Sequence, residues 1–414
     1  MNLALYMARR LYSHGGDVKR VSRPAIRIAT VGVSLGVAVM IIAVCVVFGF
    51  KQEVQQKVMG MAGHVQVLNY DYQINLEQHP IVIDDEMMST LKSVSGVKHV
   101  QRFCSHPGML KTEQSFQGVL LKGVGPDFNP DFLKKHMVDG ELPTFSDTAS
   151  TQNIVISRKL SKELKLSVGS KVYAYFFDGN VRARRFTVKG IYATHMSEFD
   201  KSIVFTDIYT THRLAQLEPD QFSGAEITVD NLEQLDQVAM KVADKVNHQS
   251  DRYGATYTSP SIRELYRGIF SWLTLLDTNV WVILCLMMAV ASFTMISGLL
   301  IIILERTQFI GTMKALGASN SRLRSLFLYF ASFIIAKGVL WGNVVGLGLV
   351  ALQYFTHFIQ LDAETYYVES VPVLFDWLFI IGINVGTLIV SFIVLVLPSY
   401  LVSRIHPARS IRFE

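Results

Sequence analysis

The chain has few charged residues and few cysteines for its length. Only 18% of its 414 residues are charged and half are hydrophobic, whereas typical soluble domains have roughly 25% charged residues. So apolar a composition excludes a disordered chain, and three cysteines cannot build a disulfide scaffold. Cys45 and Cys285 fall inside apolar runs, and Cys104 has no second cysteine in its own segment with which to pair.

Sequence motifs that carry ATP hydrolysis or metal chemistry are also missing. The chain has no G-x-x-x-x-G-K-[ST] loop, so we do not expect it to hydrolyse ATP unaided. It also lacks H-E-x-x-H, C-x-x-C and G-x-S-x-G patterns. We therefore predict no catalytic residue, no metal site and no cofactor bound by this chain.

Four long apolar runs indicate a membrane protein. Ala29–Phe50 has 22 residues without a charge, and Asn279–Leu304 and Trp377–Val402 have 26 residues each. Leu326–Gln353 has 28 residues and a single charge, Lys337. Because a helix rises 1.5 Å per residue, 22 residues reach about 33 Å, enough to cross a hydrocarbon core of roughly 30 Å. We predict four transmembrane helices over these runs, the first of them too long for a cleaved signal peptide.

The charges predict the side of the membrane that each connecting segment faces. Residues 1–28, 305–325 and 403–414 carry more basic than acidic residues, whereas 354–376 has four acidic residues and no Lys or Arg. The positive-inside rule places the first three segments in the cytoplasm and the last outside. Residues 51–278 then form a large extracytoplasmic domain between the first span and the other three. The basic pI of about 8.9 reflects this sorting of charges, so we expect no nucleic-acid partner.

The extracytoplasmic domain has mixed strand and helix patterns. Alternating apolar residues predict strands at His64–Leu68, Val119–Val124, Ile154–Ser157, Val172–Phe177, Arg184–Tyr192, Ser202–Thr206 and Ala225–Val229. Helical spacing predicts helices at Asp84–Ser93, Lys159–Leu166, Asp207–Leu217 and Leu232–Asn247. We expect an α/β fold in two lobes with a break near Phe145–Thr151, and a hairpin turn at Asp178-Gly179-Asn180.

Small residues and one charge stand out inside the predicted spans. Glycines recur four residues apart at Gly32/Gly36, Gly338/Gly342/Gly346 and Gly382/Gly386. Such spacing lets helix backbones approach closely in lipid, either within the bundle or at a dimer interface. Lys337 lies 13 residues after Arg324, or about 20 Å along a helix, too deep to reach the membrane surface easily. Two interpretations of Lys337 stay open: its charge has a functional role, or it pairs with a structural partner inside the bundle.

The segment between the second and third spans has the strongest pattern. Glu305–Ser319 reads E-R-T-Q-F-I-G-T-M-K-A-L-G-A-S. Its apolar residues Phe309, Ile310, Met313 and Leu316, with Ala315, fall at helical spacing and form a stripe on a short charged helix. Such a stripe predicts docking, either on another protein or on lipid headgroups.

This segment resembles the E-[RK]-T-x-E-I-G-x-[LM]-[RK]-A-[LI]-G-A-[ST] signature of ABC-transporter permeases of the FtsX/MacB type. It departs from the signature at Phe309, where the family often has Glu. Pro407–Glu414 is similar to the P-A-x-x-L-R-x-E ending of the family. The resemblance implies a MacB-like (type VII) architecture and a coupling helix that docks into a separate ATPase, which binds ATP and Mg. The implied coupling residues are Glu305, Arg306, Phe309, Ile310, Gly311, Met313, Lys314, Leu316 and Gly317.

Other segments resemble the LolC/LolE lipoprotein-releasing permeases, so that the resemblance covers nearly the whole chain. They are Ala4–Tyr12 with Val46–Glu53 and Gly63-His64-Val65, Gly190–Asp200 with Ser202–Asp207 (similar to G-[IF]-[FY]-x-[TS]-x-x-x-[EY]-[FY]-D), and Tyr366–Val373 (similar to Y-Y-x-x-x-[LV]-P-V). The resemblance implies a non-catalytic inner-membrane subunit that extracts triacylated or diacylated lipoproteins.

Lipoprotein extraction requires an apolar slot for acyl chains. Each buried CH₂ is worth about 0.8 kcal/mol, so removing two or three chains costs on the order of tens of kcal/mol unless a cavity shields them. The candidate lining is the outer end of the first span with part of the second: Val44, Val46, Val47, Phe48, Phe50, Val282, Leu286 and Val290. Contact with membrane lipid is the other interpretation of these residues.

The resemblance also implies partners and leaves other functions open. The implied partners are a P-loop ABC ATPase dimer, a second permease copy or a paralogue, the lipoprotein, and a periplasmic lipoprotein carrier as a further candidate. Family members that recruit the carrier have a longer hook where this chain has the short connection Phe176–Arg182. The alternatives are a MacB-like exporter of periplasmic substrates and an FtsX-like regulator of a cell-wall hydrolase. The coupling-like helix disfavours a receptor without an ATPase.

Overall fold

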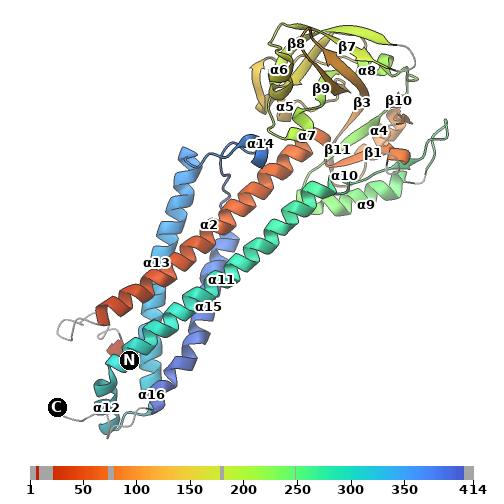
Figure 1. Ribbon diagram of the computed structural model, residues 1–414. Coiled ribbons are helices and arrows are strands. Elements are labelled where there is room, and N and C mark those ends of the chain that lie inside the picture. Colours follow the sequence, from red (N-terminus) through yellow and green to blue (C-terminus); the bar gives the residue numbers. More distant parts are fainter. Residues whose placement is uncertain (1–5, 9–21, 73–78, 178–180, 248, 405–414) are drawn as a thin grey trace. The chain divides into compact units, whose positions relative to one another are not determined.

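The computed structural model describes residues 6–8, 22–72, 79–177, 181–247 and 249–404, which form two compact units (Figure 1). We call Met1–Lys51, Trp272–Gln360 and Ser370–Glu414 the bundle, and Gln52–Ser271 with Leu361–Glu369 the α/β domain. Most of Ala4–Tyr12, the predicted turn at 178–180 and the ending 407–414 lie outside the described residues.

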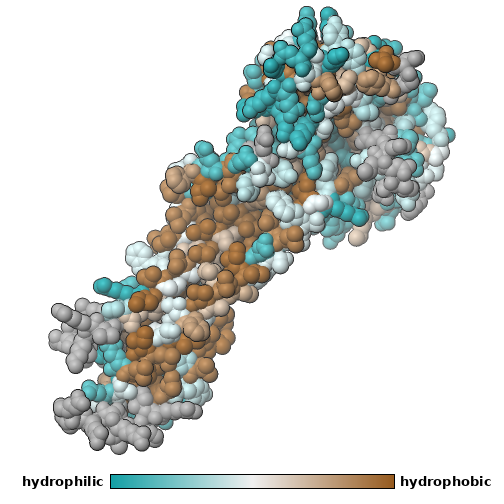
Figure 2. Space-filling view, in the orientation of Figure 1, coloured by the Kyte–Doolittle hydropathy of each residue, from teal (hydrophilic) through white to brown (hydrophobic). Residues whose placement is uncertain are grey.

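The bundle is built on four long helices. They are α2 (Ser22–Ala62), α11 (Arg267–Glu305), α13 (Asn320–Thr356) and α15 (Trp377–Ser399). Each is long and apolar enough to cross a membrane, and Figure 2 shows apolar residues covering them. The predicted fold class, four transmembrane helices with a mixed α/β domain, is therefore confirmed. Three of the helices extend beyond the predicted spans because their flanking polar sequences are also helical.

Glycines bring α13 into close contact with α2. A Cβ atom built on Gly338 would lie 2.8 Å from Val33 Cβ, and one on Gly342 would lie 2.7 Å from Val37 Cβ. The prediction that Gly338, Gly342 and Gly346 pack within the bundle is therefore confirmed. Gly382 and Gly386 of α15 differ, because a Cβ on either meets no described atom within 4 Å. For this pair, the interpretation as packing within the chain is wrong.

We expect Gly342→Leu to destabilise the bundle by about 1–3 kcal/mol, because the added side chain must displace Val37 and the Ser34 carbonyl. Thermal unfolding of the detergent-solubilised chain measures this loss. Gly348→Leu, on the same helix but in open space, is the matched control. Equal melting temperatures for the two variants would contradict the packing argument.

Amide side chains fix how α13 and the segments after it pair. Asn343 Nδ2 donates to Asn384 Oδ1 of α15 at 2.6 Å, and Asn384 Nδ2 donates to Asn343 Oδ1 at 3.0 Å. The buried Gln353 donates from Nε2 to the carbonyl oxygens of Ile359 and Val371, both at 3.1 Å. Polar groups in an apolar environment require such partners, so these bonds define one register for α13 and α15.

A ten-stranded sheet forms the centre of the α/β domain. Its order is β12-β1-β11-β3-β4-β9-β6-β8-β5, with β7 paired to β3 and β8. The strands are β1 (Val65–Asn69), β3 (Val97–Lys111), β4 (Phe116–Val124), β5 (Met137–Gly140), β6 (Asn153–Ser157), β7 (Lys171–Phe176), β8 (Arg182–Tyr192), β9 (Ile203–Asp207), β11 (Gly224–Val229) and β12 (Tyr257–Thr258). A separate pair joins β2 (Ile81–Val82) to β10 (Gln221–Phe222).

All seven predicted strands are present, and so are the four predicted helices. The helices are α4 (Asp85–Lys92), α6 (Arg158–Leu164), α8 (Ile208–Leu214) and α9 (Leu235–Val246), the last preceded by a 3₁₀ turn. Short helices α5 (Asp131–Lys135), α7 (Ser197–Asp200), α10 (Ile262–Leu265) and α14 (Ala363–Tyr366) complete the domain. The residues near 145–151 connect β5 to β6 in one continuous unit, and the division into two lobes stays a prediction.

A buried ion pair connects the sheet to the end of α2. Lys122 Nζ on β4 lies 2.5 Å from Glu226 Oε1 on β11, and their side chains are 8% and 3% exposed. Lys122 Nζ also donates to the carbonyl oxygen of Met61 in α2 at 2.7 Å. Gln101 Nε2 donates to the other carboxylate oxygen of Glu226 at 2.9 Å. Each charged atom therefore has a partner, as burial requires.

Candidate functional site

A short helix occupies the position predicted for the coupling helix. This is α12 (Thr307–Ala315), between α11 and α13. Ile310 is fully buried in the apolar core of the bundle and Gly311 is buried beside it, whereas Leu316 is 78% exposed. Met313 packs against the same core. The predicted stripe is thus divided: Ile310 and Met313 face the bundle, and Leu316 faces outward.

The remaining coupling candidates differ in exposure. Phe309 and Lys314 are half-buried, as are Glu305 and Arg306 at the junction of α11 and α12. Gly317 is exposed and has φ +88°, a left-handed conformation that glycine adopts without strain. Among the coupling candidates only Leu316 and Gly317 are exposed, so the prediction that Ile310 and Gly311 contact a partner at the surface is corrected: both are buried.

The predicted acyl-chain residues do not line one cavity. Val44 is 1% exposed and lies in the core of the bundle, so an acyl chain cannot reach it as predicted. Val46, Val47, Phe48 and Phe50 are half-buried. The rings of Phe48 and Phe379 meet edge to face at 4.6 Å, as do those of Phe50 and Trp272 at 5.6 Å. Val282, Leu286 and Val290 lie exposed on α11.

An apolar groove that the sequence did not predict lies between α11 and α15. Its volume is about 1020 Å³, and Met40 of α2 contributes to its lining. Gly382 and Gly386 line its wall, which explains why they meet no described neighbour. Their spacing was the only sequence signal for the groove. None of the eight predicted acyl-chain residues lines it.

Lys337 lies on the exposed side of α13, next to Gly338, which faces α2. Its side chain is therefore not buried in the interior of the bundle. In the parts of the chain that the structure describes, no group of three His, Cys, Asp or Glu side chains is placed to hold a metal ion.

Two segments that resemble the LolC/LolE pattern contact each other in the α/β domain. His195 Nε2 in the first lies 3.0 Å from Glu369 Oε1 in the second. Lys57, near the end of α2, donates from Nζ to the carbonyl oxygen of Tyr367 at 2.8 Å. Val368 between them is buried. These contacts make Leu361–Glu369, which lies between α13 and α15, part of the α/β domain.

Two family models match most of the chain. Residues 28–248 match the MacB-like periplasmic core domain, and residues 281–407 match the FtsX-like permease C-terminal region. The lipoprotein-releasing system transmembrane protein LolC of Xylella fastidiosa (strain 9a5c) is 22% identical, with 92% of each chain covered. LolE of Haemophilus influenzae is 21% identical, with 99% of each covered, and LolC of Neisseria meningitidis serogroup B is 23% identical, with 94% of each covered.

Among solved structures, the periplasmic region of MacB from Actinobacillus actinomycetemcomitans is 16% identical. The match covers 50% of this chain and 91% of the MacB region, with a TM-score of 0.35. The extracellular domain of the transporter YknZ from Gram-positive bacteria is 19% identical and covers 48% of this chain and 99% of that one, with a TM-score of 0.33. Because the MacB-like periplasmic core domain alone matches more than half of the 414 residues and the FtsX-like region matches most of the rest, the chain belongs to the FtsX/MacB family of ABC-transporter permeases.

Proposed function

We propose that the chain is the membrane subunit of an ABC transporter that extracts lipoproteins from the inner membrane for delivery toward the outer membrane. The observation that carries the proposal is the set of relatives named as lipoprotein-releasing system transmembrane proteins, which match over more than 90% of both chains. In this proposal a separate ATPase binds ATP and Mg and supplies the energy.

The proposed arrangement places the inner-membrane chain with both termini in the cytoplasm and the α/β domain in the periplasm. The sorting of basic residues supports this orientation. The packing of Leu361–Glu369 within the α/β domain also supports it, because the loop between α13 and α15 must then lie on the same side as residues 52–271.

In the proposed mechanism, α12 transmits the movement of the ATPase to the spans. We expect Leu316→Asp to abolish co-purification with the ATPase, because it puts a charge at the exposed apolar point of this surface. Pull-down from detergent extracts measures this. Met240→Asp, which changes another exposed apolar residue, on α9, is the control. Normal ATPase recovery with Leu316→Asp would contradict the assignment of Leu316 to the coupling surface.

A second permease copy or a paralogue completes the membrane part in this proposal. The exposed side chains of Val282, Leu286 and Val290 on α11 support it, because they offer an apolar face that no part of the described chain covers. An acyl chain between two such faces is shielded from water without being buried in either subunit. Half-buried Phe48 and Phe50 are the candidates on α2 for the same path.

The direct test reconstitutes the chain and its ATPase in liposomes with a triacylated lipoprotein. We expect ATP to release the lipoprotein into the supernatant, and a non-hydrolysable ATP analogue to release none. The same liposomes loaded with a non-acylated form of the protein distinguish an exporter of soluble substrates. ATP hydrolysis without any lipoprotein release would contradict the proposal and favour the alternative function, an FtsX-like regulator of a cell-wall hydrolase.

A further inference from the structure

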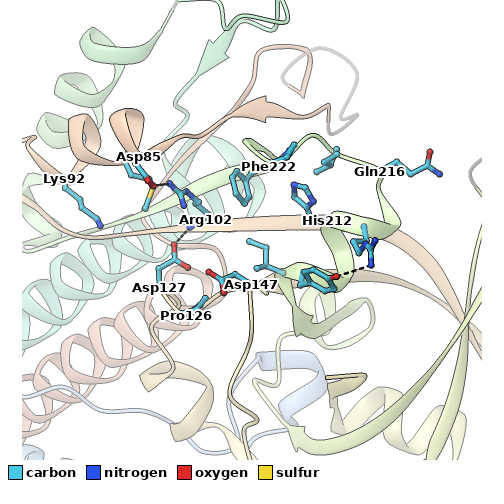
Figure 3. Close-up of a pocket in the computed structure, with 16 residues that line it drawn as sticks. Asp85, Lys92, Arg102, Pro126, Asp127, Asp147, His212, Gln216 and Phe222 are labelled. Atoms are coloured by element: carbon cyan, nitrogen blue, oxygen red, sulfur yellow. Dashed lines mark hydrogen bonds and ion pairs between the residues drawn. The ribbon is translucent and has the colours of Figure 1, made fainter. Parts of the chain in front are cut away.

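The α/β domain contains a pocket that the function proposed above does not use. Figure 3 shows it among α4, β3, the turn after β4, α8 and β10. Its volume of about 860 Å³ lies within the range of ligand pockets, which is roughly 300–1,000 Å³. Its apolar lining residues are Met88, Pro126, Ile208, Leu217, Pro219 and Phe222.

One of the cations that line this pocket is held in place by its neighbours. The Arg102 guanidinium lies 5.2 Å from the centroid of the Phe222 ring, and Arg102 Nη2 donates to Asp85 Oδ1 at 2.6 Å. The backbone N–H of Arg102 donates to Asp127 Oδ2 at 2.9 Å. His212 flanks the same Phe222 ring on the other side, with ring centroids 5.8 Å apart (Figure 3). The guanidinium is thus oriented before any ligand arrives, which reduces the entropy lost on binding.

The carboxylate that pairs with Arg102 can be exchanged for another. The side chain of Asp85 is fully exposed, and an ion pair with so exposed a member adds little stability. Asp85 is also the first residue of α4, where the positive end of the helix dipole stabilises a carboxylate without help from Arg102. A ligand carboxylate can therefore replace Asp85 at Arg102 and leave Asp85 in a favourable position.

The balance of charges indicates the class of ligand. Three basic side chains line the pocket, Lys92, Arg102 and Arg213, together with three acidic ones, Asp85, Asp127 and Asp147. A pocket without excess positive charge does not favour a polyanion such as a nucleotide or a nucleic acid. A single carboxylate next to an apolar side chain and hydrogen-bonding amides fits this lining, and these are the groups of a polypeptide.

We propose that this pocket binds an extended polypeptide segment, with a carboxylate of the segment paired to Arg102 and an apolar side chain packed on Phe222. The source of the segment rests on the proposed function: it is the polypeptide part of the extracted lipoprotein. The pocket thereby binds the protein part of the substrate, while the bundle binds its acyl chains.

The test measures peptide binding to the full chain in lipid nanodiscs. The probe is a fluorescein-labelled, amidated Gly-Ser-Asp-Phe-Ser-Gly peptide, and its counterpart has Asn in place of Asp. Fluorescence anisotropy should show saturable binding of the Asp peptide and about tenfold weaker binding of the Asn peptide, because a charge-assisted bond to Arg102 is lost. Equal binding of the two peptides, or no binding of either, would overturn the proposal.

Two pocket variants should change the affinity in opposite directions. Arg102→Gln should weaken binding of the Asp peptide about tenfold, whereas Asp85→Asn should strengthen it because the competing carboxylate is gone. Misfolding cannot produce a gain in affinity, so weaker binding by Asp85→Asn would count against the proposal.

Arg252→Gln is the matched control for the arginine. Arg252 also pairs with an aspartate, Asp220, and lies over an aromatic ring, Tyr253, but it does not line the pocket. We expect it to leave peptide binding unchanged, and a loss equal to that of Arg102→Gln would overturn the assignment. The assay uses no ATPase, and its peptide carries no acyl chain. A failure of lipoprotein release with intact peptide binding therefore contradicts only the proposed function, and the reverse result contradicts only the pocket.

Discussion

Lys122→Met is expected to destabilise the α/β domain by about 3–5 kcal/mol, the usual cost of removing one member of a buried ion pair. The variant leaves the carboxylate of Glu226, whose side chain is 3% exposed, without its cation. It also removes the hydrogen bond from Lys122 Nζ to Met61 at the end of α2. Gln66 and Gln101 still donate to Glu226, so the loss falls short of that of a fully unpaired charge.

Labelling of Cys104 measures this effect. Cys104 is fully buried in the domain, and burial raises the pKa of its thiol to about 12. It therefore reacts with a thiol reagent only when the domain opens. In a Cys45→Ser, Cys285→Ser background, the denaturant concentration at half-maximal labelling reports the stability of the domain.

Two further variants test whether the buried charge is the cause. Adding Glu226→Gln to Lys122→Met should recover much of the loss, because the neutral amide can still accept hydrogen bonds from the neighbouring glutamines. Arg263→Met breaks an exposed pair, Arg263 Nη1 to Asp236 Oδ2 at 2.6 Å, and should cost less than about 1 kcal/mol. Similar losses for the buried and exposed pairs would show that burial is not the source of the effect.

The second large effect is a loss of stability on acidification through His64. This residue follows α2, and its Nδ1 accepts a hydrogen bond from the backbone N–H of Val229 at 2.9 Å. Accepting this bond requires an unprotonated nitrogen. Burial, and then the charge of Lys98, lowers the pKa of His64 to about 4 from its usual 6.5.

The direction of this pH dependence follows from the pKa of His64 in the folded and unfolded chain. Since the pKa of His64 is lower in the folded state, the unfolded chain binds a proton first as the pH falls. The contribution of His64 is therefore fully present above about pH 6.5, decreases between pH 6.5 and 4, and changes no further below that. Each pKa unit corresponds to about 1.4 kcal/mol, so the total is up to about 3 kcal/mol, reduced by the partial exposure of the ring.

Urea unfolding followed by near-ultraviolet circular dichroism between pH 7.5 and 4.5 measures this dependence. His64→Gln keeps a hydrogen-bond acceptor but does not titrate, so its stability should change less with pH. Burial also lowers the pKa values of His136 and His195 and raises that of Asp200, so some slope remains. Identical slopes for the two chains would exclude His64 as the titrating group.

The predicted spans and the seven predicted strands of the ten-stranded sheet follow from local sequence patterns. Hydropathy over about 20 residues determines whether a helix is stable in lipid, and this sum does not depend on the fold. The long strand Val97–Lys111 was not predicted, because Pro107, Gly108 and several polar residues interrupt its alternation. It is stabilised by pairing with β11, β4 and β7, which come from other parts of the chain.

In the candidate sites, too, the sequence predicted the elements but not the contacts of their side chains. The family signature predicted a short helix at the position of α12, but the direction in which each side chain points was decided by the neighbouring helices. Ile310 faces the core and Leu316 faces outward, although both belong to one apolar stripe. Val44 was expected in an accessible lining and is buried, because helical spacing defines a face without naming the neighbour that covers it.

The sequence by itself determined the class of this protein: four apolar spans, the sorting of charges between loops, and the signature of its permease family. These properties depend on residue composition and spacing along the chain. Only the tertiary structure decided which polar groups meet. Lys122 and Glu226 are 104 positions apart, and the pocket joins Asp85, Arg102 and Phe222 from three separate elements. Such contacts depend on strand order and helix packing, which the spacing of residues does not determine.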